Sequence, residues 1–439
     1  MGMGREAALT ALTACRRLDA WSDGSLKAAC RELDRREAAL AARLTYGVLQ
    51  NRALLDHYLD ACCTQRFESL EPFIRDVLRL GAYQILFMDR VPDSAAVDES
   101  VELVKRKKHQ RASGMVNAVL RRLSREKDAL PEIPAGDRVQ YLSLRYSHPE
   151  WLVRRLVELL GEEEAEEYLR LDNEAVPTTI QRNPLRCTAA ELEESLRDAG
   201  AEVKPHPWMP ECWLLTGGGS LEAMPAFQQG WFQVQDAAAR AAVLASGVKP
   251  GVRVLDACAA PGGKSFAAAM IMEDRGEIAA CDIHRHKLAL IEKGAERLGL
   301  TCIHAELADG RQCREEWLEG FDAVLCDVPC SGLGIIRKKP DIRYKDPAQL
   351  AGLPRVQSAI LENAARRYVR PGGILLYATC TVLPEENGAV TADFLSNRPE
   401  FHLEPFRLPG LEGENNGSLT LWPQRHGTDG FYICRMRRS

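Results

Sequence analysis

The order of hydrophobic and polar positions changes character twice along the 439-residue chain. Up to about residue 128, apolar residues recur at the three- and four-residue spacing that buries one face of a helix, as in 97–104 and 115–123. A stretch rich in proline and glycine follows at 131–136, and such a stretch is typical of a linker. The pattern therefore predicts an all-α helical bundle over residues 1–137.

Residues 138–235 combine short helical and short strand-like patterns. The expected helices and strands cover Trp151–Leu160, Glu162–Leu171, Thr178–Gln181 and Trp213–Thr216. Thr188 and Glu191 have the spacing of a capping box, which predicts the start of a further helix. We therefore expect a small α/β module that follows the bundle.

Beyond about Val248, apolar runs that end in a polar residue alternate with helical patterns. The expected strands and helices cover Val252–Leu255, Ile278–Cys281, Ala323–Cys326 and Ile374–Tyr377, and 264–272, 284–298 and 355–369, respectively. This alternation predicts a Rossmann-like, doubly wound and mostly parallel sheet over residues 236–439, with Phe431–Met436 as an edge strand. The predicted fold class is thus α plus α/β in three domains.

Polar residues end four of these predicted segments, and ligands of such sheets bind beyond the carboxyl ends of the strands. The residues are Asp256, Asp282, Asp327 and Cys380. We expect them to converge on one crevice although they lie far apart in the sequence.

The loop Asp256–Ser265 permits three interpretations. It lacks the G-x-G-x-x-G of dinucleotide-binding proteins. Gly263-Lys264-Ser265 fits the end of a P-loop, with Ala323–Asp327 as a Walker B-like strand, but Cys258 stands where a P-loop needs its first glycine. S-adenosylmethionine, a cationic sulfonium without phosphates, suits a tight glycine turn near carboxylates. Asp282 then has the place of a ribose-binding acid, which a P-loop protein does not need.

Composition and charge exclude some classes of protein. The chain is 46% hydrophobic and 27% charged, as is usual for a globular protein, and no apolar run predicts a membrane span or a secretory signal. The fourteen cysteines contain no C-x-x-C pair, so we expect reduced thiols, a cytoplasmic location and no metal site. The net charge is -5, but residues 1–140 hold 23 basic and 20 acidic residues, a local net of +3 that is compatible with RNA binding.

Two cysteines, Cys330 and Cys380, follow predicted strands at the edge where ligands bind. A thiolate is a good nucleophile when a helix N-terminus or a neighbouring cation lowers its pKa, and we expect both loops to run into helices. Candidate RNA contacts are the basic clusters 105–108 with Arg111, Arg121 with Arg122, and 337–339 with Arg343.

Three motifs in this order resemble the RNA cytosine-5 methyltransferases of the Nop2/Sun family. They are Asp256-Ala-Cys-Ala-Ala-Pro-Gly-Gly-Lys264, Asp327-Val-Pro-Cys-Ser-Gly332 and Tyr377-Ala-Thr-Cys-Thr381. As in the bacterial Sun-type rRNA enzymes, the N-terminal bundle resembles NusB-type RNA-binding domains, in the stretches Leu44–Leu49, Arg79–Leu86 and Gly114–Arg121. The middle module resembles the family's RNA-recognition-like subdomain, in Tyr146–Trp151 and Arg182-Asn183.

The chain departs from the family pattern at two places. Gly388 stands where an acid is expected after Pro384–Asn387, and alanines rather than serines follow Gln235-Asp236. Neither change affects a residue to which the resemblance gives a chemical role.

The resemblance implies methylation of C5 of a cytosine in small-subunit (16S) rRNA, as by the family enzyme for nucleotide 967. It implies that Cys380 attacks C6 of the base and that Cys330 resolves the adduct. Asp327 is expected to bind the cytosine edge, and Lys264 to lie near the base. The S-adenosylmethionine contacts are expected from Cys258, Ala259, Ala260, Pro261, Gly262, Gly263, Lys264, Asp282, Asp309 and Asp327.

Three alternatives stay open at this point: methylation of another RNA such as tRNA, a non-catalytic RNA-binding or ribosome assembly factor, and the P-loop protein. The expected partner is small-subunit rRNA, naked or in an early assembly particle. We expect a monomer without a membrane partner.

Overall fold

The computed structural model describes residues 2–18, 22–413 and 415–439, and the chain separates into two compact units. The helical unit comprises Met1–Ala175 together with Ile336–Lys345, and the sheet unit comprises Val176–Ile335 and Asp346–Ser439. The division at Ala175 therefore lies beyond the linker at 131–136, and the helices expected at Trp151–Leu160 and Glu162–Leu171 belong to the helical unit.

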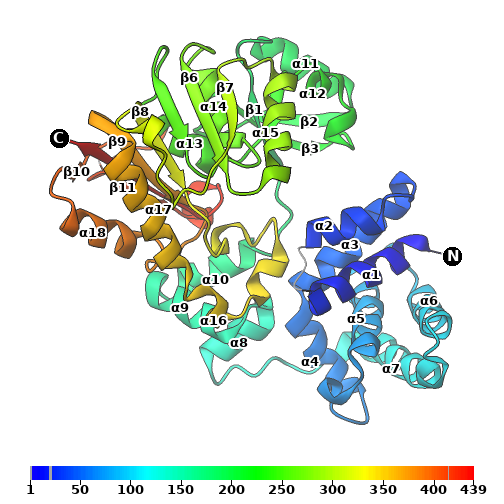
Figure 1. The fold of residues 1–439 in the computed structure, drawn as a ribbon. Helices are drawn as coiled ribbons and strands as arrows, with labels where there is room; N and C mark the ends of the chain where they lie inside the picture. Colours follow the sequence, from blue (N-terminus) through cyan, green and yellow to red (C-terminus); the bar gives the residue numbers. More distant parts are fainter. Residues whose placement is uncertain (1, 19–21, 414) are drawn as a thin grey trace. The chain divides into compact units, whose positions relative to one another are not determined.

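The helical unit is built from ten α-helices over its described residues (Figure 1, blue to teal). They are α1 (Met3–Leu18), α2 (Ser22–Ala29), α3 (Arg35–Gln50), α4 (Arg52–Cys62), α5 (Pro72–Phe87), α6 (Asp93–Arg106), α7 (Ser113–Glu126), α8 (Arg138–Tyr146), α9 (Glu150–Leu160) and α10 (Glu162–Leu171). Residues 76–85 of α5 are all buried, because α1, α3, α4, α6 and α7 pack around this helix. The predicted all-α N-terminal region is confirmed.

The main sheet of the sheet unit has the strand order β10-β12-β9-β8-β5-β6-β7, with β11 paired to β12. Its parallel strands are β5 (Arg253–Asp256), β6 (Glu277–Asp282), β7 (Ile303–Leu307), β8 (Phe321–Asp327) and β9 (Val369–Thr379). The antiparallel strands are β10 (Phe401–Leu403), β11 (Ser418–Leu421) and β12 (Phe431–Arg438). The predicted mostly parallel sheet is confirmed.

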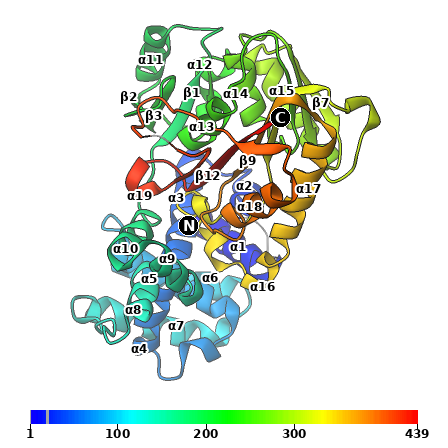
Figure 2. The same cartoon turned by 90° about the vertical axis from the view of Figure 1, so that its left-hand side faces the viewer.

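The prediction of an edge strand at Phe431–Met436 is wrong. Strand β12 lies between β9 and β10, and Figure 2 shows it in dark red beside β9. Phe431 and Ile433 are buried on one face of the sheet, while Tyr432 and Cys434 are buried on the other. An apolar run on both faces belongs to an interior strand, since an edge position would leave part of it in water.

Helices cover both faces of this sheet, as the doubly wound prediction requires (Figure 1). On the face of Val254 lie α13 (Ala237–Ala245), α14 (Gly263–Ile271) and α15 (Arg285–Leu298). On the face of Leu255 lie α17 (Leu353–Arg367) and α18 (Gly388–Asn397). The short helices α16 (Pro347–Leu350) and α19 (Pro423–His426) also belong to this unit.

A second, four-stranded antiparallel sheet precedes the main one in the chain. Its elements follow the order β1 (Thr178–Arg182), α11 (Ala189–Asp198), β2 (Ala201–Pro205), β3 (Cys212–Gly217), α12 (Pro225–Gln228) and β4 (Phe232–Val234). This β-α-β-β-α-β succession with strand order β2-β3-β1-β4 is the ferredoxin-like arrangement. Thr188 and Glu191 form the predicted capping box at the start of α11.

The strand order of the main sheet reverses between β5 and β8. From β5 the chain proceeds outward through β6 to β7, and it then returns to place β8 on the other side of β5. Such a switch point leaves a crevice beyond the carboxyl ends of the two strands. Asp256 and Asp327 are the residues that end them.

Candidate active site

The four polar residues expected to converge do lie along one edge of the sheet. Asp256, Asp282 and Asp327 are the last residues of β5, β6 and β8, and Cys380 follows the last residue of β9. These strands are neighbours in the order β9-β8-β5-β6, with all four carboxyl ends at the same edge. The candidate site is therefore built on rigid strand ends.

The loop at 256–265 is anchored to the strand ends by main-chain hydrogen bonds. The Ala257 amide donates to the Leu325 carbonyl at 2.9 Å, and the Ala259 amide donates to the Cys281 carbonyl at 2.6 Å. Gly262 precedes α14 with φ +110°, and a Cβ at this position would lie 2.4 Å from the ring of Phe266. Glycine is thus required at this turn by both its backbone conformation and the close approach of the aromatic ring.

Asp256 acts inside the protein rather than on a ligand. It is fully buried and accepts a hydrogen bond from the Ser265 hydroxyl at 2.7 Å. Burial raises the pKa of its carboxyl group to about 6. Asp256 therefore ties the first turn of α14 to the end of β5 and sets the path of the loop between them.

Two of the acids proposed to contact the cofactor, Asp282 and Asp309, differ in their hydrogen-bond partners. Asp282 is 8% exposed and accepts a hydrogen bond from the His284 amide at 2.8 Å. Asp309 is bound by Arg311, which donates to both of its carboxylate oxygens and thereby lowers the pKa of that group. Ile283, next to Asp282, is 50% exposed, an apolar surface that sequence reasoning missed because one isoleucine beside a strand end gives no pattern.

Lys264 and Asp327 form an ion pair across the switch point. The Lys264 ammonium lies 2.6 Å from Oδ2 of Asp327 and 5.2 Å from the ring centre of Phe431. The lysine side chain is 13% exposed and the aspartate side chain 26%. Burial by itself would lower the pKa of Lys264, but the Asp327 carboxylate raises it. The Lys264 ammonium therefore keeps its charge, and the pair is open to solvent on one side.

The thiols of Cys330 and Cys380, in the loops after β8 and β9, lie next to each other. Sγ of Cys330 and Sγ of Cys380 are 3.3 Å apart, and both cysteines are free. The hydrogen bond with Cys380, together with burial, raises the pKa of Cys330 well above its usual value. Cys330 therefore stays protonated at neutral pH, and either thiol can be the donor in this contact.

The prediction that both thiol loops run into helices is confirmed for Cys380, whose loop leads into α18 at Gly388, and is wrong for Cys330, after which the chain forms only a 3-10 turn at Leu333–Ile335. Neither sulfur thus lies at a helix N-terminus. The nearby cation is Lys264, whose charge interacts with that of Cys380.

Two glycines that sequence reasoning did not single out, Gly334 and Gly430, allow their two loops to approach the loop of Cys380 closely. The Gly334 amide donates to the Cys380 carbonyl at 3.0 Å, and the Gly430 amide donates to the Gly334 carbonyl at 2.8 Å. A Cβ at Gly334 would lie 1.9 Å from the carbonyl oxygen of Gly430. The only sequence signal was the glycine content of the loop that contains Cys330.

One of the predicted RNA contacts is wrong. Arg343 has no exposed surface and belongs to the helical unit, where its guanidinium is surrounded by acceptors. It donates to the carbonyl oxygens of Gln50, Tyr146, Ser147 and Asp172 and to Oδ1 of Asn173. A charged group that is buried in this way serves the fold, since it cannot reach a phosphate.

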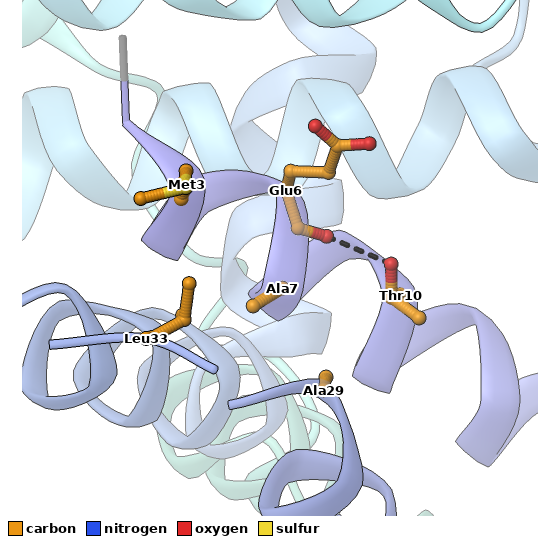
Figure 3. A pocket seen from close by; sticks show the side chains of 6 residues that line it. All are labelled: Met3, Glu6, Ala7, Thr10, Ala29 and Leu33. Carbon is orange, nitrogen blue, oxygen red and sulfur yellow. Dashed lines mark hydrogen bonds between the residues drawn. The ribbon is translucent and has the colours of Figure 1, made fainter. Parts of the chain in front are cut away.

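The helical unit also has a hollow of about 260 Å³ lined by α1 together with Ala29 and Leu33 (Figure 3). Its polar groups are already engaged: the Thr10 hydroxyl donates to the Glu6 carbonyl at 2.9 Å, and the Glu6 carboxylate pairs with Lys107.

Over the described ranges, no helix is long and apolar enough to cross a membrane, and no cluster of three or more acidic, histidine or cysteine side chains could hold a metal.

Three family models match the chain in succession. The NusB family matches residues 4–125, a ferredoxin-like domain of RsmF/B-like methyltransferases matches 148–222, and the 16S rRNA methyltransferase RsmB/F matches 243–437. In this family the loop at 256–265 is part of a methyltransferase domain, so the P-loop interpretation has no support.

Individual relatives agree over the full length. The chain is 37% identical to the probable ribosomal RNA small subunit methyltransferase B of Bacillus subtilis, covering 99% of this chain and 98% of the relative. It is 33% identical to the ribosomal RNA small subunit methyltransferase B of Vibrio cholerae, over 94% of this chain and 93% of the relative. The crystal structure of PH0851 superposes with a TM-score of 0.85 at 26% identity, covering 100% of this chain and 99% of that one. The chain therefore belongs to the RsmB/F family of 16S rRNA methyltransferases.

Proposed function

We propose that this protein methylates C5 of a cytosine in small-subunit rRNA through a covalent bond between Cys380 and C6 of the base. The observation that carries the proposal is the 3.3 Å approach of Cys330 and Cys380 at the sheet edge that also presents the Lys264–Asp327 pair. The names of the relatives support small-subunit rRNA as the substrate.

The residues present fit S-adenosylmethionine, which when bound would supply the methyl group. The turn at Gly262 brings the main chain of residues 258–263 close to the strand ends, where a ligand can lie against it. The Asp282 carboxylate suits ribose hydroxyls, and the exposed face of Ile283 suits an adenine ring. Asp309, held by Arg311, is the further acid proposed at the adenine end.

Cysteine chemistry supplies the activation that cytosine needs. C5 is a poor nucleophile, and addition of the Cys380 thiolate to C6 makes C5 resemble an enamine carbon that can attack the methyl group. Loss of the C5 proton to water and departure of the Cys380 sulfur as a thiolate then restore the aromatic ring. We infer that Cys330, whose sulfur lies 3.3 Å from that of Cys380, assists this departure by donating a hydrogen bond to the thiolate.

The ion pair at the switch point is placed to hold the base. Asp327 is proposed to accept a hydrogen bond from the cytosine edge, and Lys264, 2.6 Å from its Oδ2, is proposed to hold that carboxylate in position. Since C6 is attacked from one side while C5 is methylated, the target cytosine must be looped out or flipped from its stack.

The experiment is methyl transfer from labelled S-adenosylmethionine to naked small-subunit rRNA, with tRNA as the alternative substrate. We expect wild type to label C5 of one rRNA cytosine, Cys380→Ala to label nothing, and Cys330→Ala to accumulate a covalent protein–RNA adduct. Cys313→Ala, at an exposed cysteine, is the matched control and should behave as wild type. Full activity of Cys380→Ala would refute the nucleophile, and rRNA binding without transfer would favour the non-catalytic alternative.

A further inference from the structure

A carboxylate that the reaction does not use lies at the junction of the two thiol loops. Glu386 is 2% exposed and follows Cys380 in the same loop. Burial of an ionised carboxylate is costly unless hydrogen bonds or an ion pair compensate it. In the part of the chain that the structure describes, Glu386 has no ion-pair partner, and its compensation comes from neutral donors.

Both donors come from the surroundings of Cys330. The Ser331 amide donates to Oε2 of Glu386 at 2.9 Å, and Nε2 of Gln357 donates to the same oxygen at 2.8 Å. Nε2 of Gln357 also donates to the Pro329 carbonyl at 3.0 Å. The residue after Cys330 is therefore bound to Glu386 directly, and the residue before it is bound through Gln357.

Hydrogen bonds also hold the loop that contains Cys380. The Thr381 hydroxyl and the Ser331 hydroxyl are 2.7 Å apart, so the residues that follow the two cysteines are hydrogen-bonded to each other. The Tyr377 hydroxyl donates to the main-chain carbonyl of Glu386 at 2.5 Å, which ties the glutamate to strand β9. Glu386 thus connects the strand that ends before Cys380 to the loop that contains Cys330.

We propose that Glu386 is a positioning residue for the reaction, whose carboxylate holds the main chain on both sides of Cys330 so that its sulfur faces that of Cys380. It does not touch the reacting atoms and acts through the two cysteines. The inference rests on the proposed roles of these thiols. The charge of Glu386 acts in the same direction, because it adds to the causes that keep Cys330 protonated.

Two substitutions separate the hydrogen bonds from the charge. Both donors converge on one oxygen, so Glu386→Gln can keep both bonds through its amide oxygen while removing the charge. Glu386→Leu removes the bonds and the charge together. Glu385→Gln, at the exposed neighbouring acid, is the matched control.

The first readout is the rate at which diamide oxidises Cys330 and Cys380 to a disulfide in the full-length protein. This rate reports how the two sulfurs face each other and does not depend on methyl transfer, so it stands even where the proposed function fails. The second readout is kcat and KM for methylation of small-subunit rRNA.

We expect Glu386→Leu to slow disulfide formation and to lower kcat by about tenfold or more, with KM changed little, because small displacements of reacting groups reduce rates steeply. Glu386→Gln should keep both values within about threefold of wild type, as should the control. If Glu386→Leu does not fold, Gln357→Met, which removes the same donor, is expected to slow both processes in a folded protein. The proposal is overturned if the Leu variant oxidises and methylates like wild type, or if Gln is as damaging as Leu.

Discussion

Two basic side chains of this molecule, Lys264 and Arg343, are largely withdrawn from solvent, yet their surroundings differ. Lys264, in the sheet unit, pairs with Asp327 at an edge where both side chains keep some exposure. Arg343, in the helical unit, is fully buried and donates to the carbonyls of three residues, Gln50, Tyr146 and Ser147, among other acceptors. A charged side chain with one ion-pair partner and access to solvent can contact a substrate, whereas a charged side chain surrounded by buried acceptors stabilises the fold.

The surroundings of Arg343 are consistent with a structural role. His148 and Asp172 are both buried, with Nδ1 of His148 2.8 Å from the Tyr146 carbonyl and Nε2 3.2 Å from Oδ2 of Asp172. Burial lowers the pKa of His148 well below its usual value and raises the pKa of Asp172 to about 7. A neutral imidazole that donates to Tyr146 and accepts from a protonated Asp172 satisfies both contacts. Arg343 is thus a permanent charge of this cluster, and the charge of Arg337 also acts on Asp172.

The strongest test of the comparison is Arg343→Met, which leaves its carbonyl acceptors buried without a donor. We expect the free energy of unfolding of the helical unit to fall by about 3–5 kcal/mol, the loss typical of breaking a buried charged network. Denaturant unfolding followed by circular dichroism measures it. Arg125→Met, at an exposed arginine of α7, should change the value by less than about 0.5 kcal/mol. An equally small effect at Arg343 would remove the structural half of the comparison.

Lys264→Met tests the other half. We expect kcat for rRNA methylation to fall by about 10²–10³-fold, the usual loss when one charged group that stabilises a reacting centre is removed. The melting temperature should change little, because the Asp327 carboxylate left behind retains access to water. Lys293→Met, at an exposed lysine of α15, is the control. A variant that is fully active but strongly destabilised would make Lys264 a structural residue like Arg343.

Asp172→Asn tests the protonation state of the buried cluster. Because the pKa of Asp172 is raised in the folded state, its stabilising contribution is present at low pH and is lost as the pH rises from about 4 through about 7. Relative to the asparagine variant, wild type should therefore lose on the order of 2–4 kcal/mol between pH 4 and pH 8.

The measurement is the difference in unfolding free energy between the two proteins at each pH. Asp128→Asn, at an exposed acid of the same unit, should show no such trend. A constant difference across the range would mean that Asp172 is ionised throughout and pairs with Arg343 instead.

The sequence predicted best those features that depend on local pattern. The strand ends at Asp256, Asp282 and Asp327 and the helix Glu162–Leu171 follow directly from periodicity, since each residue's burial repeats with its element. The apolar run of β12 indicates an interior strand, but its neighbours β9 and β10 were not predictable, because such a run does not say which strands flank it.

The site was predictable in its residues and not in its contacts. The loop motifs singled out Cys330, Cys380 and Asp327, but no local signal reports that Glu386 and Gln357 hold the Cys330 loop, or that Lys264 pairs with Asp327. Arg343 was assigned to RNA because a run of basic residues is visible in the sequence and its buried acceptors, which lie far away in the chain, are not. Partners distant in sequence decide what a charge does.

The smallest expected effect concerns two basic residues that are neither paired at the sheet edge, as Lys264 is, nor buried, as Arg343 is. Lys108 and Arg111 are exposed and line a hollow of about 770 Å³ with Glu71 and His109. Within the described ranges, their side chains have no hydrogen-bond or ion-pair partner. Exposed basic side chains without a partner are the ones that gain most by neutralising RNA phosphates.

The double variant Lys108→Gln/Arg111→Gln should bind small-subunit rRNA about tenfold more weakly at low salt, and the slope of log affinity against log salt should fall by about 1–2. Lys127→Gln, which removes an exposed lysine paired with Asp93, should leave the slope unchanged. An unchanged slope in the double variant would show that exposed and unpaired charge in the helical unit does not suffice for RNA binding, and that the contact must be sought on another face.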